Sequence, residues 1–175
     1  MAKVLVAYAS RLGGTRGIAQ AIGNGLGSRG HEVIVKSVSD VSNVDEFDAI
    51  VLGSGVFANH WHKPALEFGR RNEAALKARP VWLFSSGPVG DIKNPGPLAD
   101  PKEVAALRER LRPRDHQIFW GSLDRAALDR SDLGTISRFI SKRFIPEGDW
   151  RDWPAIDAWA GVISDSLPRA AAVAL

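Results

Sequence analysis

Apolar and polar positions along this chain follow two different periods. Short apolar runs, some continuous and some alternating with polar residues, stop at glycine, proline or polar clusters and therefore predict β-strands. We expect strands at residues 4–8, 32–36, 49–54, 81–85 and 117–120. Segments whose apolar residues recur every three or four positions predict amphipathic helices between the strands. We expect these helices at residues 15–28 and 63–77, around Val104, Leu107 and Leu111, and near the C-terminal end.

The last helix has the clearest pattern of all. Asp152 and Pro154 are typical of a helix start. Its apolar face is expected to consist of Ile156, Trp159, Ala160, Ile163 and Leu167. Strands that alternate with amphipathic helices in this way predict an α/β fold, with a parallel sheet covered by helices on both faces.

The expected organisation also indicates where a ligand would bind. No linker or repeat divides the chain, so we expect a single domain over residues 1–175, with an insertion around 121–151 before the last helix. Parallel sheets bind their ligands beyond the carboxyl ends of the strands. The loops at 9–15, 54–62 and 86–101 are therefore where a site is expected.

Composition excludes several classes of function. The 175 residues contain no cysteine, which rules out disulfides, thiolate catalysis and cysteine-ligated metal centres. With no apolar run of about 18 residues and no signal-peptide pattern, we expect a cytoplasmic protein without a membrane-spanning helix. The net charge is only +3, and no aromatic stacking platform accompanies it, so we expect no nucleic-acid binding.

One glycine pattern does not carry the function that its spacing suggests. Gly25, Gly27 and Gly30 form G-x-G-x-x-G. A dinucleotide-binding fingerprint must follow a strand and begin a helix. Here the pattern ends the helix at 15–28 and leads into the next strand, so these glycines are predicted to terminate a helix.

The loop after the first strand predicts a phosphate site. It consists of Ser10, Arg11, Leu12, Gly13, Gly14 and Thr15. Hydroxyls stand at both ends, and the glycines allow backbone N–H groups to close around an oxyanion at the start of a helix. The loop contains no acid, and Arg11 and Arg16 add positive charge. The alternative is an ordinary strand–helix turn in which Thr15 is the helix cap.

The pattern Ser10-x-x-Gly13-x-Thr15 resembles the phosphate loop of flavodoxin-like FMN proteins. The second loop, Gly53-Ser54-Gly55-Val56-Phe57, and the third, Phe84-Ser85-Ser86-Gly87, agree with this likeness. The resemblance implies a flavodoxin-like three-layer sandwich with a five-stranded parallel sheet that binds FMN. The residues it implies for FMN are Ser10, Arg11, Leu12, Gly13, Gly14, Thr15, Gly55, Val56, Phe57, Ala58, Asn59, Ser86, Gly87, Pro88, Val89 and Gly90.

Within that group the chain looks like the branch that contains menaquinone-dependent protoporphyrinogen dehydrogenase. Residues 10–16 match its Ser/Thr-Arg-x-Gly-x-Thr-Arg loop, and His60-Trp61-His62 matches its His-aromatic-His tripeptide, whereas residues 87–91 depart from its third loop. The resemblance implies an FMN-dependent oxidoreductase that passes electrons from a planar organic substrate to a quinone-type acceptor. The alternative is a flavodoxin-type one-electron carrier with a redox partner protein.

Two features favour two-electron chemistry over a carrier. Ala58-Asn59 stands where flavodoxins have a glycine peptide that flips toward the reduced ring. Alanine resists positive φ, so that flip should cost about 1 kcal/mol more. The basic charge of the chain favours the anionic, fully reduced flavin. We expect Phe57 or Trp61 to cover one face of the ring, and the other face to be open or capped by Pro88 and Val89.

The remaining candidates allow alternatives. His60 and His62 could donate protons or hold a substrate carboxylate, or one of them could simply cap the helix at Pro64; we expect no metal there. An apolar stripe in a basic segment, Leu133, Ile136, Phe139, Ile140 and Phe144, is typical of peripheral membrane contact or of a helix facing the core. The basic cluster from Arg108 to Arg114 is typical of an anion-binding surface or of a solvated helix end.

Overall fold

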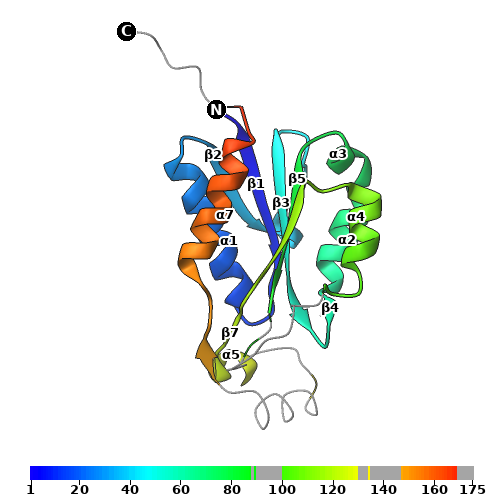
Figure 1. Ribbon diagram of the computed structural model, residues 1–175. Coiled ribbons are helices and arrows are strands. Elements are labelled where there is room, and N and C mark those ends of the chain that lie inside the picture. The colour runs from blue at the N-terminus through cyan, green and yellow to red at the C-terminus, as the bar shows by residue number, and fades with distance from the viewer. Residues whose placement is uncertain (88, 90–99, 130–133, 135–146, 169–175) are drawn as a thin grey trace.

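A parallel sheet lies at the centre of the molecule. The computed structural model describes residues 1–87, 89, 100–129, 134 and 147–168 (Figure 1). In this part of the chain, five parallel strands run in the order β2-β1-β3-β5-β6. Their bounds are Lys3–Ala9 (β1), Glu32–Ser37 (β2), Ala49–Phe57 (β3), Val81–Ser86 (β5) and Asp115–Phe119 (β6). The two-residue strand β4, His60–Trp61, pairs antiparallel with the end of β3.

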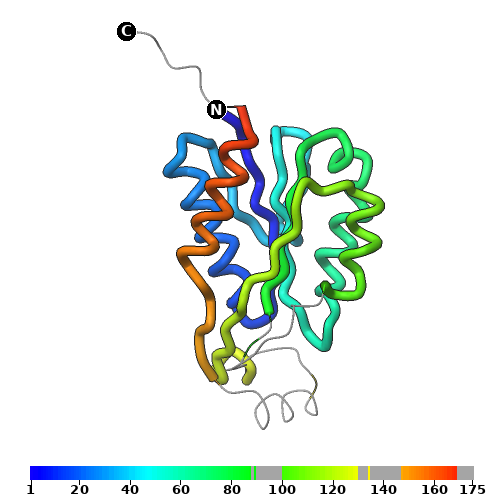
Figure 2. Tube along the Cα trace, in the orientation of Figure 1, coloured from blue at the N-terminus to red at the C-terminus, as the bar shows by residue number. Residues whose placement is uncertain are grey.

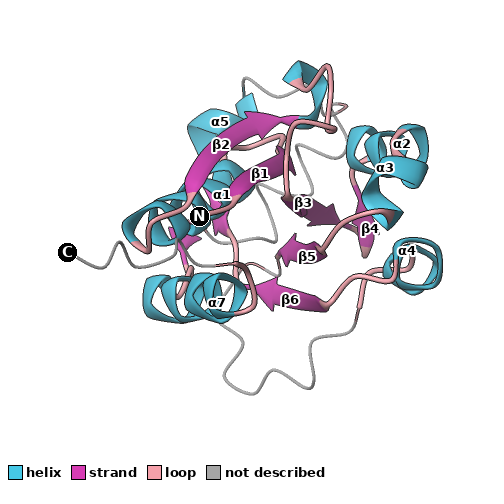
Figure 3. Ribbon diagram, turned by 90° about the horizontal axis from the view of Figure 1, so that it is seen from above, coloured by secondary structure: helices cyan, strands magenta, loops and turns pink. Residues whose placement is uncertain are grey.

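Helices cover both faces of this sheet, which confirms the predicted three-layer α/β fold. Helices α1 (Gly14–Ser28) and α7 (Trp153–Asp165) lie on one face (Figure 3). Helices α2 (Lys63–Arg71), α3 (Glu73–Lys77) and α4 (Val104–Leu111) lie on the other. The strand order reverses between β1 and β3, so the carboxyl ends of these two strands form the switch point at which such sheets bind ligands.

Each face of the sheet has its own hydrophobic core. Between the sheet and α1 and α7, apolar side chains of β1, β3 and β5 pack on Ile18, Ile22, Ile156 and Ile163. On the other face, Leu5, Leu52 and Leu83 pack on Phe68, Leu107 and Leu111. Gly53 in β3 is required by this packing, because the ring of Phe84 occupies the space that a Cβ atom would need.

Two predicted elements differ from the observed ones. The helix expected at 63–77 is two helices, because the chain turns at Asn72, whose side-chain amide donates to the carbonyl of Phe68 (3.0 Å). The strand expected at 117–120 begins at Asp115 and ends at Phe119. Its first residues are polar, and hydrogen bonds of Asp115 to Trp159 and of His116 to Ser85 compensate their burial, so apolar patterning did not detect them.

The described parts of the segment predicted to be an insertion, around residues 121–151, lie beyond the carboxyl ends of the strands and next to the start of α1 (Figure 2). Its described elements are β7 (Ser122–Leu123), α5 (Arg125–Asp129) and β8 (Gly148–Asp149), with β7 and β8 paired antiparallel. The apolar stripe Leu133–Phe144 falls outside the described residues except for Gly134, and so its membrane contact stays a prediction. None of the helices described has the length and apolar character that crossing a bilayer requires.

Candidate functional site

The first loop leaves the start of α1 open to an anion. Gly13 is the N-cap residue and adopts φ +86°, and its N–H donates to Ser10 Oγ (3.1 Å). The first intrahelical bond runs from Gly17 N–H to the carbonyl of Gly13 (3.1 Å), so the three N–H groups before Gly17 project from the helix end. The first turn carries no acid, and a Cβ on Gly13 would meet no atom within 4 Å. This geometry fits a phosphate group.

Thr15 is not the helix cap that the alternative interpretation required. It is the second residue of α1 and is buried, with its hydroxyl directed toward the second loop. A Cβ on Gly55 would lie 2.9 Å from Thr15 Oγ1 and 2.9 Å from His62 Nε2. The first two loops therefore meet at Gly55, where only a residue without a side chain leaves room for both groups. His62 reaches this point because its N–H donates to Ser54 Oγ (2.9 Å).

The second loop is a tight hairpin with an exposed aromatic residue at its end. Phe57 pairs with His60, and Ala58 (φ 50°) and Asn59 (φ 65°) form the two-residue turn between them, as in a type I′ turn. The Phe57 side chain is 39% exposed, whereas Trp61 is 3% exposed and donates from Nε1 to Ser85 Oγ (2.7 Å). The expectation that either aromatic residue could cover the flavin is corrected: Trp61 belongs to the core, and Phe57 is the available ring.

Glu103, just before α4, holds the hairpin in place. Its carboxylate accepts from the Trp61 N–H (3.1 Å) and lies 2.6 Å from His60 Nδ1. The adjacent Lys102 N–H donates to the carbonyl of Asn59 (3.1 Å). Burial acts to raise the pKa of Glu103, but these hydrogen bonds outweigh it and hold the pKa below its usual value. Sequence reasoning missed Glu103, because no local pattern connects it with a hairpin 42 residues earlier.

A buried chain of hydrogen bonds lies behind the hairpin. Ser85 Oγ accepts from Trp61 Nε1 and therefore donates to His116 Nε2 (2.8 Å). The His116 Nδ1 proton then faces Asp100 Oδ1 (3.1 Å). Burial lowers the pKa of His116 although Asp100 opposes that change. The serine, histidine and aspartate are ordered as in a hydrolase, but Ser85 is fully buried, so the chain fastens β4, β5 and β6 together and does not face a substrate.

The third loop approaches the second at Val56. Gly87 has φ +132°, its N–H donates to the carbonyl of Phe119 (2.9 Å), and a Cβ there would lie 3.5 Å from Val56 Cβ. Ser86 is buried at the end of β5. A methyl of Val89 would lie 3.1 Å from a Cβ on Gly121. Pro88 and Gly90 lie outside the described residues, so capping of a flavin face by Pro88 and Val89 stays a prediction.

The two candidate histidines have separate environments. His60 lies against Glu103, whereas the His62 ring lies against Gly55 beside Thr15. Only His62 is therefore close to the phosphate loop. Within the described residues, no group of three His, Cys, Asp or Glu side chains is arranged to hold a metal ion.

Comparisons with known proteins agree with this arrangement. A family model described as a flavodoxin domain matches residues 5–143. A flavodoxin from the domain Archaea is 25% identical over 81% of this chain and 99% of its own, with a TM-score of 0.54. Oxidised Flavodoxin 1 from Bacillus cereus is 17% identical over 95% of this chain and 99% of its own, with a TM-score of 0.58.

A third structure contains the same fold within a larger protein. Rubredoxin oxygen:oxidoreductase from Desulfovibrio gigas is 12% identical and covers 94% of this chain, but this chain covers 35% of that protein, with a TM-score of 0.59. These matches support the flavodoxin domain in general. They do not distinguish the protoporphyrinogen dehydrogenase branch from other proteins that contain the domain.

Proposed function

The chain belongs to the flavodoxin-domain family, whose members bind FMN, and on that premise we propose that it is an FMN-dependent oxidoreductase. In this proposal it passes electrons in pairs from a planar organic substrate to a quinone-type acceptor. Each turnover removes two hydrogen atoms from the substrate and converts the quinone to a quinol. When bound, FMN supplies the capacity to accept and release one or two electrons.

The three loops have different roles in this proposal. The hydroxyls of Ser10 and Thr15, together with the N–H groups at the start of α1, bind the phosphate. His62 adds a polar ring beside Thr15. Phe57 supplies the exposed aromatic surface against one face of the flavin ring. The third loop has no aromatic residue between 86 and 91, and in this proposal a planar substrate binds on the opposite face of the flavin ring.

The observation that supports two-electron transfer is the restrained turn of the hairpin at Ala58 and Asn59. A carrier that stabilises one-electron-reduced flavin needs a backbone peptide that reorients toward the ring. The expectation that alanine would resist a positive φ at this turn is wrong, because Ala58 already has φ 50°. What opposes a reorientation is the hydrogen bond from the Lys102 N–H to the carbonyl of Asn59 (3.1 Å). Reorienting the turn would break this hydrogen bond and disturb the Glu103 contacts with His60 and Trp61. The net charge of +3 acts in the same direction, because it favours anionic, fully reduced flavin.

A one-electron carrier with a redox partner protein is the second candidate. The observation that favours it is the likeness to whole flavodoxins, which extends over 99% of the Bacillus cereus protein. The two candidates differ in whether one-electron-reduced flavin accumulates during reduction.

Stepwise anaerobic reduction of the FMN-loaded protein tests this difference. We expect the oxidised flavin bands to bleach directly, without the long-wavelength absorbance of a one-electron-reduced state. The matched variant Ala58→Gly relieves the backbone restriction at the same turn, and we expect more of that absorbance in it than in the wild type. Strong long-wavelength absorbance in the wild type would instead support the carrier.

The phosphate loop is tested by adding a negative charge inside it. We expect Thr15→Glu to abolish tight FMN binding, because a carboxylate beside the helix start repels the phosphate dianion. Gln20→Glu adds the same charge on the exposed middle of α1 and serves as the control. Fluorescence titration with FMN measures both. Tight binding retained by Thr15→Glu would contradict the loop assignment.

A further inference from the structure

The phosphate loop and the first turn of α1 contact residues of the segment at 121–151 as well as the sheet. We propose that residues 122–123, 128 and 148–151 form a buttress that keeps the phosphate loop in its binding conformation, with Arg151 and Leu12 as positioning residues for the FMN phosphate. The proposal rests on the FMN function proposed above. It assigns a role to the segment predicted to be an insertion.

Apolar packing makes the first contact between the loop and the buttress. Leu12 belongs to the phosphate loop, and its side chain packs against the small cluster formed by Leu123 and Leu128, against which Trp150 also packs. Leu123 and Leu128 are buried, although they belong to neither of the two large cores. Because the apolar side chain of Leu12 gains its cover from the insertion, moving the loop would expose this small cluster to water.

Arg151 makes the second contact, at the first turn of α1. Its Nη1 donates to the carbonyl of Gly14 (3.3 Å), and its guanidinium lies 4.4 Å from the centre of the Trp153 ring. Two hydrogen bonds to Asp149, of 2.8 and 2.5 Å, fix the guanidinium further. Its side chain is only 16% exposed. Because Asp149 balances its charge at close range, Arg151 acts on the loop through position and not as a free cation.

Backbone packing makes the third contact. A Cβ on Gly14 would lie 2.9 Å from Ser122 Oγ and 3.3 Å from the Ser122 carbonyl, so β7 lies directly against the start of the helix. A Cβ on Gly17 would collide with Arg151 Nη1, which shows how closely the guanidinium covers this turn. The Trp150 N–H donates to the carbonyl of Gly121 (3.1 Å) and extends the pairing of β7 with β8 to the residue before Arg151.

These contacts give the insertion a consequence for ligand affinity. A loop whose conformation is already fixed loses less conformational entropy when a ligand binds. The phosphate is the part of FMN that this loop would hold, whereas the ring is held by the other two loops. Weakening the buttress should therefore reduce the affinity for FMN and leave the affinity for riboflavin, which has no phosphate, nearly unchanged.

The experiment compares Arg151→Ala and Leu12→Ala with Arg114→Ala. Arg114 is a matched control at the opposite end of the sheet: its guanidinium lies 5.2 Å from the Trp82 ring centre, and its Nη1 donates to the carbonyl of Ser166 (3.0 Å). FMN and riboflavin affinities are measured by fluorescence titration of the same preparations. Amide hydrogen exchange of residues 10–15 is measured in the flavin-free proteins.

We expect the two buttress variants to bind FMN at least about tenfold more weakly, the loss expected when one positioned hydrogen bond or buried contact is removed. We expect their riboflavin affinity to change by less than about twofold, and the exchange of residues 10–15 to be faster. Arg114→Ala should show neither effect. Should Arg151→Ala fail to fold, Arg151→Lys keeps the charge but loses the fixed guanidinium geometry, and the same changes are expected.

Equal losses of FMN and riboflavin affinity, or unchanged exchange at residues 10–15, would overturn the buttress. Failure of the wild type to bind FMN would refute the proposed function, and the exchange measurement would still decide whether the insertion orders the loop. The two failures are therefore distinguishable.

Discussion

Ala58 shows how a single residue can restrict the chemistry of a loop. A non-glycine residue at φ 50° is uncommon, and alanine has no side-chain hydrogen bond with which to offset the strain. The hairpin keeps this conformation nevertheless, because the Lys102 N–H binds the carbonyl of Asn59. The Glu103 carboxylate binds the side chain of His60 and the N–H of Trp61. The surroundings thus hold Ala58 in a conformation that its own preferences oppose.

We expect Ala58→Gly to raise the free energy of unfolding by about 0.5–1 kcal/mol, because glycine adopts positive φ without strain. Urea denaturation of the flavin-free protein measures the change. Ala158→Gly, at an exposed position inside α7, is the control and should lower stability by about 1 kcal/mol. A loss of stability in both variants would show that the turn at Ala58 is not strained.

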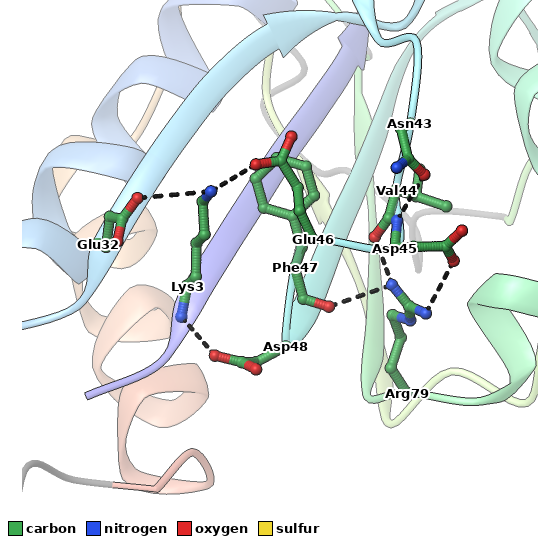
Figure 4. Close-up of polar contacts among 9 residues, drawn as sticks. All are labelled: Lys3, Glu32, Asn43, Val44, Asp45, Glu46, Phe47, Asp48 and Arg79. Carbon is green, nitrogen blue, oxygen red and sulfur yellow. Dashed lines mark hydrogen bonds and ion pairs between the residues drawn. The ribbon is translucent and has the colours of Figure 1, made fainter.

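At the scale of elements, the two ends of the sheet have different roles. The three loops follow the carboxyl ends of the strands, whereas charged side chains stabilise the segments at the amino ends of the strands (Figure 4). There Lys3 donates from its N–H to Asp48 (2.8 Å). Arg79, which follows α3, donates to the carbonyls of Val44 and Phe47 and contacts Asp45 (3.3 Å). Arg79 therefore fastens the segment that leads into β3.

We expect Arg79→Ala to lower the free energy of unfolding by about 1–3 kcal/mol, since it leaves two partly buried carbonyls without their donor. FMN affinity should stay the same, because Arg79 acts at the amino ends of the strands, opposite the loops. Arg71→Ala, at an exposed position in the last turn of α2, should change stability by less than about 0.5 kcal/mol. Thermal unfolding and FMN titration of the two variants separate these effects. A large loss of FMN affinity in Arg79→Ala would contradict the view that the amino ends of the strands contribute stability and only the carboxyl ends bind FMN.

At the scale of the whole molecule, buried histidines connect distant parts of the chain. His31 Nδ1 accepts from the Ala2 N–H (3.3 Å), and its Nε2 lies 3.0 Å from Ser164 Oγ, so one ring joins the residue before β1 to helix α7. His116 connects Ser85 with Asp100. Burial lowers the pKa of both histidines from the usual value near 6.5.

These pKa shifts predict that stability falls in mild acid. Below the unfolded-state pKa the unfolded chain binds protons that the folded chain does not, so the free energy of unfolding decreases as pH falls below about 6.5. We expect a decrease between about pH 7.5 and about pH 5.5 in urea denaturation. The decrease should be smaller in His31→Gln. An unchanged pH dependence in His31→Gln would exclude a contribution from His31.

Local patterns were sufficient for most of the fold. Apolar periodicity predicted the five parallel strands and the helices on both faces, since burial against a two-sided sheet requires those patterns. The start of the last helix was also predictable, because Asp152 caps it through a local bond to the Ala155 N–H (3.0 Å). Local patterns failed at Asn72 and at Asp115–His116, where hydrogen bonds, and not apolar contacts, decide the conformation.

The sequence by itself determined the fold class and the three loops, because both depend on residues close together in the chain. Only the tertiary structure decided which side chains reach the candidate site. It directed His62 to Thr15 and His60 to Glu103, and it placed Trp61 in the core. It also brought Arg151 to Gly14. His60 and Glu103 lie 43 positions apart in the chain, and Gly14 and Arg151 lie 137 positions apart. Such pairings depend on how the layers and the segment at 121–151 pack, so they leave no periodic signal in the sequence.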